Sequence, residues 1–598
     1  MRRYSTSIIV TALLALLLAA PVAAHANLVR SEPQAGALLQ TAPKEIILEF
    51  SEELDPSFSR VQLHASKNQI VNAGPGVIDP ANPRIMRLAL GDLPKDSYTA
   101  IWRSRSAADG HITEGSVPFG VGVAVSTASL IPAPDAPDPA TIPPAPLDAA
   151  VRWLNVLLAA FALGGLPFGL LIWRPALRKA MADAQERLAD ASGQRSVPSG
   201  WVAADAAMTR ALQRMILIGG GLLLVSTILF LLTQAAAAAD VPLAQAIGAP
   251  AVQLLGSRTG RLILARMVLI VLLGALAWRL PPAGRGAAWP WLVGLALAGG
   301  VILTFSLNAH GAAEEQGAAL AVALDWLHVT AMVIWLGGLT PLLIAIRAPR
   351  RNPDVDSGAP GQALPLAALI PRFSWVALPC VVTLALTGLY SYLLHIGSLD
   401  LLAATTYGRA LLIKLSLFGL LFLLGALNLL VLTPRLRASG NRMARAFGRS
   451  VRTEVVLGAL LLLAVGAMTS VAPSKSAWQE HERLGLAQEA TVGEVDLVLR
   501  VAPAQIGDNE FAVDVTDKRP GAQEAASKVL LRFDMQGMTS GVLQTDTQTA
   551  DKQRYTARGN FTSMGGRWDV EVVLRRAGFD DVRHTFQMDI VRSALQAQ

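Results

Sequence analysis

Histidine and carboxylate side chains, which commonly bind metal ions in proteins, occur at two places in this chain in patterns suited to sharing one ion. The first group is His25 together with Asp109 and His111. If His25 begins the mature chain, its α-amine and its imidazole can chelate the same ion. Asp109 and His111 are two residues apart, so on a strand they point to the same side. Two imidazoles, an amine and a carboxylate suit Cu(II), the tightest-binding divalent ion of the first-row series.

A simpler interpretation of Asp109 and His111 stays open. Asp109-Gly110 is a frequent hairpin turn, and His111 would then be a surface histidine beside it. Spacing alone does not separate this turn from a metal site.

The N-terminus decides whether His25 can chelate an ion. Two arginines precede an apolar run over 8–20, and small residues follow at 22–26, which is typical of a secretory signal peptide. Cleavage after Ala24 assigns 1–24 to the signal and leaves His25 as the first residue. Cleavage after Ala26 removes it.

The second group lies in an apolar part of the chain and consists of His310, Asp325 and His328. Asp325, His328, Met332 and Trp335 follow the spacing i, i+3, i+7, i+10, so they form one stripe on a helix. An ionisable residue at membrane depth costs about 2.5–3.5 kcal/mol to insert, and such residues usually serve a function. The imidazoles, and more weakly the thioether of Met332, are candidate copper ligands.

Asp325 also has a purely structural interpretation. A buried ion pair with Arg266 or with Lys414 would hold helices together without any metal. The two roles do not exclude each other.

Eight apolar stretches, each about 20 residues long, are able to cross a bilayer core of roughly 30 Å. They lie at 149–173, 211–235, 259–279, 287–307, 318–346, 373–394, 410–433 and 454–472. Lys and Arg concentrate in the loops 174–210, 279–286, 347–372 and 434–452, whereas the alternate loops carry only Arg258 and Arg409. The positive-inside rule therefore places both chain ends outside the cytoplasm, as the signal peptide also requires.

The membrane part repeats internally. The segments 153–156 and 164–166 match 326–329 and 337–339 with equal spacing, and 260–266 resembles 408–414. Four helices per unit predict a parallel 4+4 repeat about an axis along the membrane normal. The halves differ chemically, because His328 corresponds to Asn155, which is the asymmetry expected of a single off-axis site.

Composition limits the class of protein. Hydrophobic residues make up 52% of 598 residues and charged residues only 16%, which indicates a polytopic membrane protein. Because excess Arg belongs in cytoplasmic loops, the net charge of +7 does not indicate a nucleic-acid partner. Cys380 is the only cysteine, which excludes an internal disulfide and a cysteine-cluster metal site. No segment resembles a nucleotide-binding loop.

The sequence patterns predict a multidomain protein. Short alternating runs such as 46–50 and 98–102, and later 495–499 and 568–572, predict an all-β sandwich on each side of the eight-helix membrane domain. The expected parts are a signal peptide (1–24), an N-terminal β domain (25–127), a Pro-rich linker (128–147), the membrane domain (148–473) and a C-terminal β domain (485–598).

Three segments of the N-terminal domain carry a family pattern. They are His25-Ala26-x-Leu28-x-x-Ser31-x-Pro33-x-x-Gly36, Leu48-x-Phe50-Ser51-Glu52 and Trp102-Arg103-x-x-Ser106-x-x-Asp109-Gly110-His111-x-x-x-Gly115-x-x-x-Phe119. This pattern resembles the periplasmic copper-resistance protein CopC over nearly all of 25–125. The resemblance implies a β-sandwich that binds Cu(II) through His25, Asp109 and His111, and a signal cut after Ala24. Met86 stands alone, so we expect no Cu(I) site here.

The membrane domain carries a second pattern. It comprises Asp325-x-x-His328 with Trp335-x-Gly337-Gly338, Arg372-Phe373-Ser374, Tyr407-Gly408-Arg409 with Lys414, Asn428, Pro434-Arg435, and Arg452-x-x-Glu454. These pieces resemble the copper-resistance membrane protein CopD. The resemblance implies copper passage across, or copper delivery at, the bacterial inner membrane.

The C-terminal domain is similar to small YtkA-like envelope domains through Met535-x-Gly537-Met538 and through Phe561, Gly565 and Trp568. Met535, Met538 and Met564 are weak candidates for a soft Cu(I) site, and methionines of this kind more often fill a core.

Together these patterns predict a multi-pass inner-membrane protein that binds copper outside and imports or transfers it, with no catalytic role. Its expected partners are copper ions and the lipid bilayer, with other envelope copper chaperones as further candidates. Two alternatives stay open. The chain sequesters copper as a tolerance module without transport, or it is a membrane-anchored copper or haem oxidoreductase.

Overall fold

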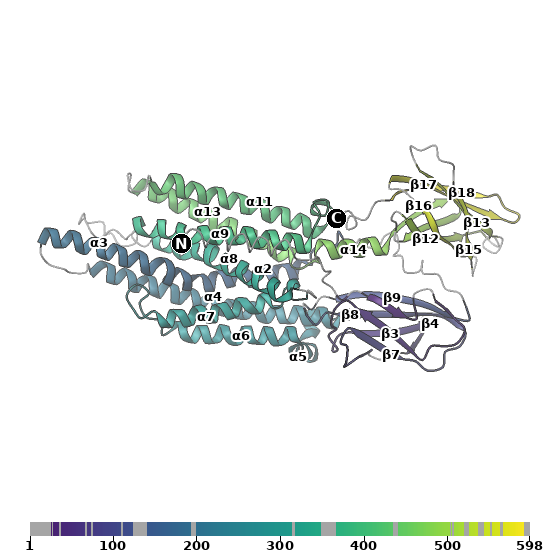
Figure 1. The fold of residues 1–598 in the computed structure, drawn as a ribbon, viewed down its shortest axis with the longest axis horizontal. Helices are drawn as coiled ribbons and strands as arrows, with labels where there is room; N and C mark the ends of the chain where they lie inside the picture. Colours follow the sequence, from purple (N-terminus) through teal and green to yellow (C-terminus); the bar gives the residue numbers. More distant parts are fainter. Residues whose placement is uncertain are drawn as a thin grey trace.

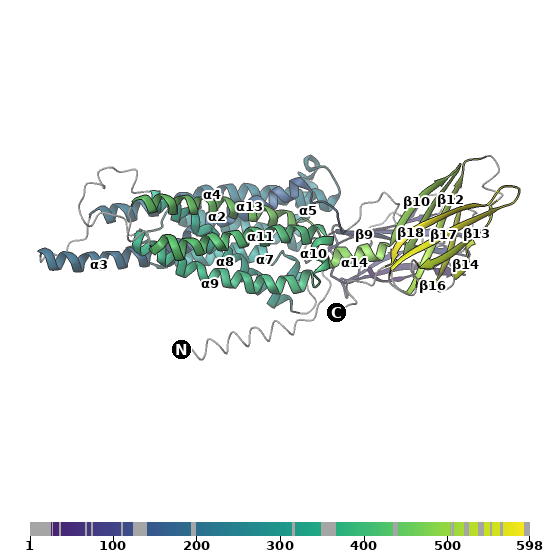
Figure 2. The same ribbon diagram turned by 90° about the horizontal axis from the view of Figure 1, so that it is seen from above.

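The structure is a computed structural model that describes residues 26–590, apart from 27, 35–36, 66–68, 73–75, 109, 111, 124–139, 193–198, 314–316, 348–365, 435–440, 503, 505–506, 520–525, 536–542, 550–552 and 563–565. It has an N-terminal β domain, a long bundle of helices and a C-terminal β domain (Figure 1). Both β domains lie at the same end of the bundle, and helix α3 (Arg174–Ser192), from one of the predicted Arg-rich loops, lies at the opposite end (Figures 1 and 2).

The N-terminal domain is a sandwich of two sheets, as predicted. One sheet has the order β1 (Leu28–Glu32), β3 (Glu45–Phe50), β7 (Ile85–Ala89), β6 (Val77–Ile78). The other has the order β2 (Ala37–Leu39), β9 (Ile112–Val121), β8 (Asp96–Arg105), β4 (Arg60–Ala65), β5 (Ile70–Asn72). Alternate residues of β3 are buried, and Phe50 packs edge-on against Trp102 at 5.1 Å between ring centroids.

Among the described residues, the helical bundle contains eight helices that are long and apolar enough to cross a membrane, which agrees with the prediction from the sequence. In chain order the first half has α2 (Pro146–Pro167), η2 (Phe168–Trp173), α3, α4 (Ser199–Ala239), α5 (Ala249–Gly256), α6 (Arg258–Ala277) and α7 (Trp289–Ser306). The second half has η4 (His310–Ala313), α8 (Ala318–Arg347), α9 (Leu366–His395), α10 (Asp400–Ala404), α11 (Thr406–Leu427), η7 (Asn428–Leu432) and α13 (Asn441–Met468), followed by α14 (Ser474–Leu484).

Several helices are longer than the apolar stretches predicted for them. The first continues through η2 into the charged helix α3, and α4 begins at Ser199 rather than at 211. The reason is that hydropathy marks only the part of a helix that matches the bilayer core. Backbone hydrogen bonding continues through the polar turns beyond it.

Contacts between the halves follow the predicted repeat. Trp153 Nε1 donates to the Ala459 carbonyl on α13 at 3.1 Å, and its repeat partner Trp326 donates to the Gly299 carbonyl on α7 at 2.9 Å. The first helix of each half therefore bonds to the last helix of the other half. This reciprocal arrangement is what a twofold relation between the halves produces.

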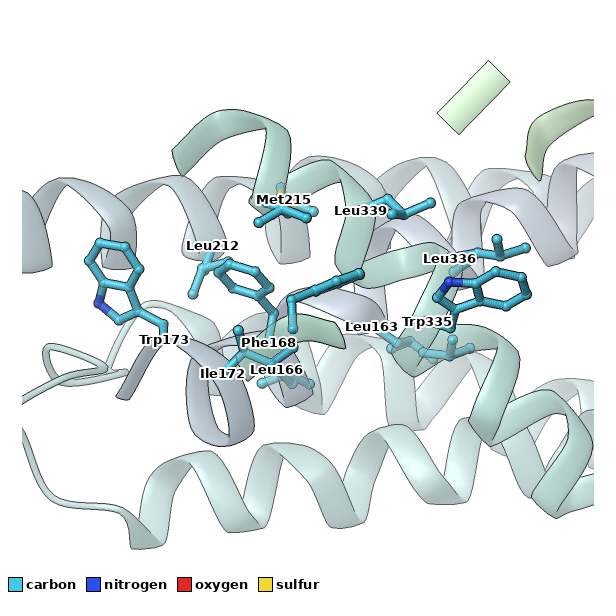
Figure 3. Packing of buried hydrophobic residues seen from close by; sticks show 14 of the residues in the cluster. Leu163, Leu166, Phe168, Ile172, Trp173, Leu212, Met215, Trp335, Leu336 and Leu339 are labelled. Atoms are coloured by element: carbon cyan, nitrogen blue, oxygen red, sulfur yellow. The ribbon is translucent and has the colours of Figure 1, made fainter. Parts of the chain in front are cut away.

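The core of the bundle lies where the first helices of the two halves meet (Figure 3). Phe168 and Leu212 pack in it, and they are completely buried. Trp335 borders this core, and its ring also contacts Phe418 edge-on at 5.9 Å between centroids. Trp335 therefore connects the packed core to Phe418 on α11.

The C-terminal domain is a second two-sheet β structure, again as predicted. One sheet has the order β10 (Leu486–Val492), β11 (Val495–Ala502), β12 (Gly507–Asp517), β16 (Arg554–Thr562), β15 (Gln548–Thr549). The other has the order β14 (Leu543–Asp546), β13 (Ala526–Met535), β17 (Gly566–Arg576), β18 (Val582–Ile590). The strict alternation of buried residues along β11 places its apolar face on the core between the sheets.

Candidate functional site

A cavity of about 590 Å³ lies inside the helical bundle, mainly in its second half. The three residues predicted there from the sequence, His310, Asp325 and His328, all line it. Met332 and Trp335 line it as well, so the whole predicted stripe of α8 faces the cavity. The helical spacing read from the sequence thus identified the face that borders this cavity.

His328 is oriented by a hydrogen bond across to α9. Its Nδ1 lies 2.8 Å from Thr387 Oγ1, and that hydroxyl donates its only hydrogen to the Thr383 carbonyl at 2.6 Å. Thr387 must therefore accept from Nδ1–H, which places the lone pair of the ring on Nε2. The described residues offer Nε2 no hydrogen-bond partner, so this nitrogen is available as a ligand toward the cavity.

Asp325 has a cation nearby, and it is one of the two predicted from the sequence. Lys414 on α11 interacts electrostatically with Asp325. Arg266 is engaged elsewhere: its Nε donates to Thr304 Oγ1 at 2.9 Å, and its guanidinium lies over the Phe305 ring at 3.6 Å. The choice between Lys414 and Arg266 depended on how the helices pack.

His395, to which the sequence assigned no role, lies beside His310. The ring centroids are 6.0 Å apart with an interplanar angle of 73°, and both residues line the cavity. The two histidines are far apart in the chain, so only their positions at the ends of neighbouring helices could have suggested the pairing. Within the described ranges no group of three or more His, Cys, Asp or Glu residues is placed to hold one ion.

The predicted site of the N-terminal domain cannot be described directly, because His25, Asp109 and His111 lie outside the described residues. At least one chain neighbour of each lies within the described residues. The carbonyl of Ala26 accepts hydrogen bonds from Thr113 Oγ1 at 2.7 Å and from Ser104 Oγ at 3.0 Å. Ala26 is thereby tied to the beginning of β9, which follows directly after His111 in the sequence.

The N-terminal domain is docked on the end of the bundle where both β domains lie (Figure 1). Arg103 donates from Nη1 and Nη2 to the carbonyls of Ala238 and Ala237, at 2.9 and 2.8 Å, at the end of α4. Phe58 belongs to a hydrophobic cluster that includes Val151 and Phe230 of the bundle, and Phe230 lines the cavity. Buried charge-assisted bonds and an apolar contact thus join the two domains.

The loop that carries the predicted ligands borders this interface. Arg258, at the start of α6, donates to the Ala108 carbonyl. A Cβ on Gly110 would lie 3.4 Å from Thr259 Oγ1, and Gly110 has a φ of +79°, which favours glycine. Ala108 and Gly110 flank Asp109, so this loop contacts the membrane domain.

The methionines predicted as weak ligands in the C-terminal domain do not form a described group. Met535 is partly buried, pairs with Trp568 between β13 and β17, and packs against the core. Met538 and Met564 lie outside the described residues. Met535 thus has a packing role of the kind that methionines commonly have.

Comparisons with known proteins agree with this arrangement. Residues 28–122 match the sequence model of the CopC domain, and residues 367–468 match that of copper resistance protein D, CopD. The chain is 26% identical to the copper transport protein CutJ of Bacillus subtilis over 574 residues, which are 94% of this chain and 95% of that protein.

Two further relatives match the N-terminal domain alone. Protein YobA of Escherichia coli is 32% identical over 120 residues, which cover 20% of this chain and 93% of YobA. The crystal structure of PcoC, a methionine-rich copper resistance protein from Escherichia coli, is 34% identical, with 16% of this chain and 99% of that chain covered and a TM-score of 0.15.

Proposed function

The chain belongs to the copper-resistance proteins, with a CopC domain and a CopD domain in one polypeptide, and on this premise we propose that it imports copper across the membrane. The cavity lined by His310, Asp325 and His328 carries the proposal, because an anchor for an outer binding domain does not need buried ionisable groups around an internal cavity. Copper is the cargo, and the N-terminal domain is its first binding site.

Capture takes place in the N-terminal domain. His25, Asp109 and His111 supply two imidazoles, a carboxylate and the N-terminal amine, a donor set that suits Cu(II). The hydrogen bonds that hold the Ala26 carbonyl support this assignment, since they fix the chain one residue after His25. A fixed N-terminus lets the amine and the imidazole act together without a large ordering cost.

Transfer follows within one molecule. The loop around Asp109 lies against the start of α6, and the docked domain shares an apolar cluster with Phe230 at the cavity wall. Copper released from the N-terminal domain therefore starts its path close to the membrane domain. A short intramolecular path raises the effective concentration of copper at the cavity.

The cavity then accepts the ion. His328 presents Nε2, and Thr387 holds the other ring nitrogen, an arrangement typical of metal-binding histidines. Asp325 offers negative charge one helical turn away, opposed by Lys414. A copper cation at Asp325 would compete with Lys414 for the carboxylate. Return of Lys414 to Asp325 then provides a means to release the ion.

Copper uptake into cells tests the proposal. Cells with equal membrane expression of the wild type, a His25→Ala/His111→Ala double variant, His328→Ala and His481→Ala would be compared for cytoplasmic copper. His481 packs against Trp478 on α14, and it is not among the residues that line the cavity, so His481→Ala is the matched control. We expect the wild type and His481→Ala to raise cytoplasmic copper and His328→Ala to abolish the rise.

Two results separate the alternatives. Loss of uptake only in the His25→Ala/His111→Ala variant would make the N-terminal domain the essential donor and contradict the role of His328. If cytoplasmic copper never rises while external copper is depleted, the chain sequesters copper without importing it.

A further inference from the structure

We infer that His310 and His395 form one copper site at the mouth of the cavity, with the ion held between the two imidazoles. The inference rests on the proposed function for the identity of the metal. It adds His395 as a ligand, and it adds a binding step between the N-terminal domain and His328.

The separation of the two rings fits a shared ion. Two imidazoles that bind one metal through bonds of about 2 Å have ring centres about 4 to 6 Å apart. The observed 6.0 Å lies at the upper end of this range, which corresponds to imidazoles on nearly opposite sides of the ion. Imidazole is a common ligand of copper, as it is of zinc, iron and nickel, so the proposed function identifies the metal.

The backbone around His395 favours a cation. His395 is the last residue of α9, and Ile396 and Gly397 both donate their amide N–H to the Tyr392 carbonyl, at 2.9 and 3.1 Å. Gly397 has a φ of +72°, so it closes the helix in the usual C-terminal manner. The C-terminal end of a helix carries partial negative charge, which attracts a positive ion.

Asn308 provides a third candidate donor. Its Oδ1 is buried and has no hydrogen-bond partner among the described residues, and the side chain lines the same cavity two residues before His310. A buried amide oxygen without a partner costs free energy. A metal ion, or a water on that ion, would satisfy it.

The basic residues of the cavity do not prevent a cation from binding at the mouth. Arg152 is paired with Asp148 at 2.7 Å, Lys414 is opposed by Asp325, and Arg266 lies over Phe305. His328 is hydrogen-bonded to Thr387 on α9, and His395 lies eight residues later on the same helix, about 12 Å along its axis. The mouth pair is therefore a separate step from the deeper histidine.

Copper content of the purified full-length chain tests the inference. The wild type, His310→Ala, His395→Ala, the double variant His310→Ala/His395→Ala and His481→Ala would be loaded with Cu(I) under anaerobic conditions, desalted, and analysed for copper per chain. We expect each single variant to lose one copper, the double variant to lose the same single copper, and His481→Ala to lose none. X-ray absorption of the copper-loaded proteins should show fewer imidazole ligands in His395→Ala than in the wild type, and no decrease in His481→Ala.

The outcomes are distinct. Unchanged copper content in His395→Ala, or loss of two coppers in the double variant, would overturn the shared site. If an alanine variant fails to fold, judged by gel filtration, the same comparison uses His395→Gln, which keeps a side chain of similar length. If uptake into cells fails for the wild type while the single copper is still lost in these variants, the mouth site stands and the import proposal fails.

Discussion

Gly164 of α2 and Gly337 of α8 lie in direct backbone contact: a Cβ on Gly164 would lie 2.4 Å from the Gly337 carbonyl carbon, and one on Gly337 would lie 2.3 Å from the Ala160 carbonyl oxygen. The two glycines are repeat partners, so each half of the bundle meets the other through the same residue. Small residues let membrane helices approach closely and gain packing energy. This contact therefore holds the two halves together beside the cavity.

A larger residue at this crossing should destabilise the bundle. Gly337→Ala places a methyl group against backbone atoms that have no room to move, and overpacking of this kind costs about 1–3 kcal/mol. The measurement is thermal unfolding of the purified chain in detergent. Gly274→Ala on α6 is the control, because a Cβ there meets nothing within 4 Å. Equal melting temperatures for the two variants would contradict the close contact.

Thr387 should control the affinity of the cavity for copper. Thr387→Val removes the oxygen that accepts from His328 Nδ1–H, whereas Thr387→Ser keeps it. Loss of a hydrogen-bond partner behind a metal-binding histidine typically lowers affinity about 10- to 100-fold. Competition titration with a copper chelator measures the effect. The same affinity in the valine and serine variants would show that this bond does not orient His328.

Arg103 should hold the N-terminal domain on the bundle. Arg103→Ala removes two hydrogen bonds from a charged group to the end of α4, and bonds of this type contribute about 1.5–3 kcal/mol each. Hydrogen exchange should accelerate in the segments 103–110 and 237–240. Arg60→Ala is the control, because its pair with Asp240 at the same interface is long and exposed. Equal exchange in both variants would argue against a docked domain.

The C-terminal domain should lose stability in acid through Asp514. Burial raises the pKa of this carboxyl, but hydrogen bonds from Arg554 and Arg500 outweigh it and hold the pKa below its ordinary value. Because the folded pKa is depressed, the contribution to stability is complete above the unfolded pKa of about 3.9 and is lost as the pH falls through the folded value.

Hydrogen exchange of strands β12 and β16 in the full-length chain measures this loss. The protection of the wild-type strands should decrease below about pH 4, and Asp514→Asn should already have low protection at neutral pH and a weaker pH dependence. Asp496→Asn, at an exposed pair with Lys518, is the control. A wild-type profile that matches Asp514→Asn at every pH would contradict the role of the carboxylate.

Much of the architecture was predictable from local patterns. Eight apolar stretches predicted eight membrane helices, because crossing a bilayer requires a run of apolar residues that is visible in any single sequence. The spacing of Asp325, His328, Met332 and Trp335 predicted one stripe on one helical face, because the side-chain directions on a helix follow from its periodicity alone, and this face borders the cavity. The family pattern predicted the N-terminal sandwich in the same local way.

Tertiary structure alone decided which distant residues meet. His395 lies beside His310 only because α9 ends where η4 begins in space, and Lys414 rather than Arg266 opposes Asp325 because Arg266 is bound to Thr304. Such pairings depend on how helices cross and rotate against one another. Those geometries come from the packing of many side chains at once, whereas periodicity and composition report only on each segment by itself.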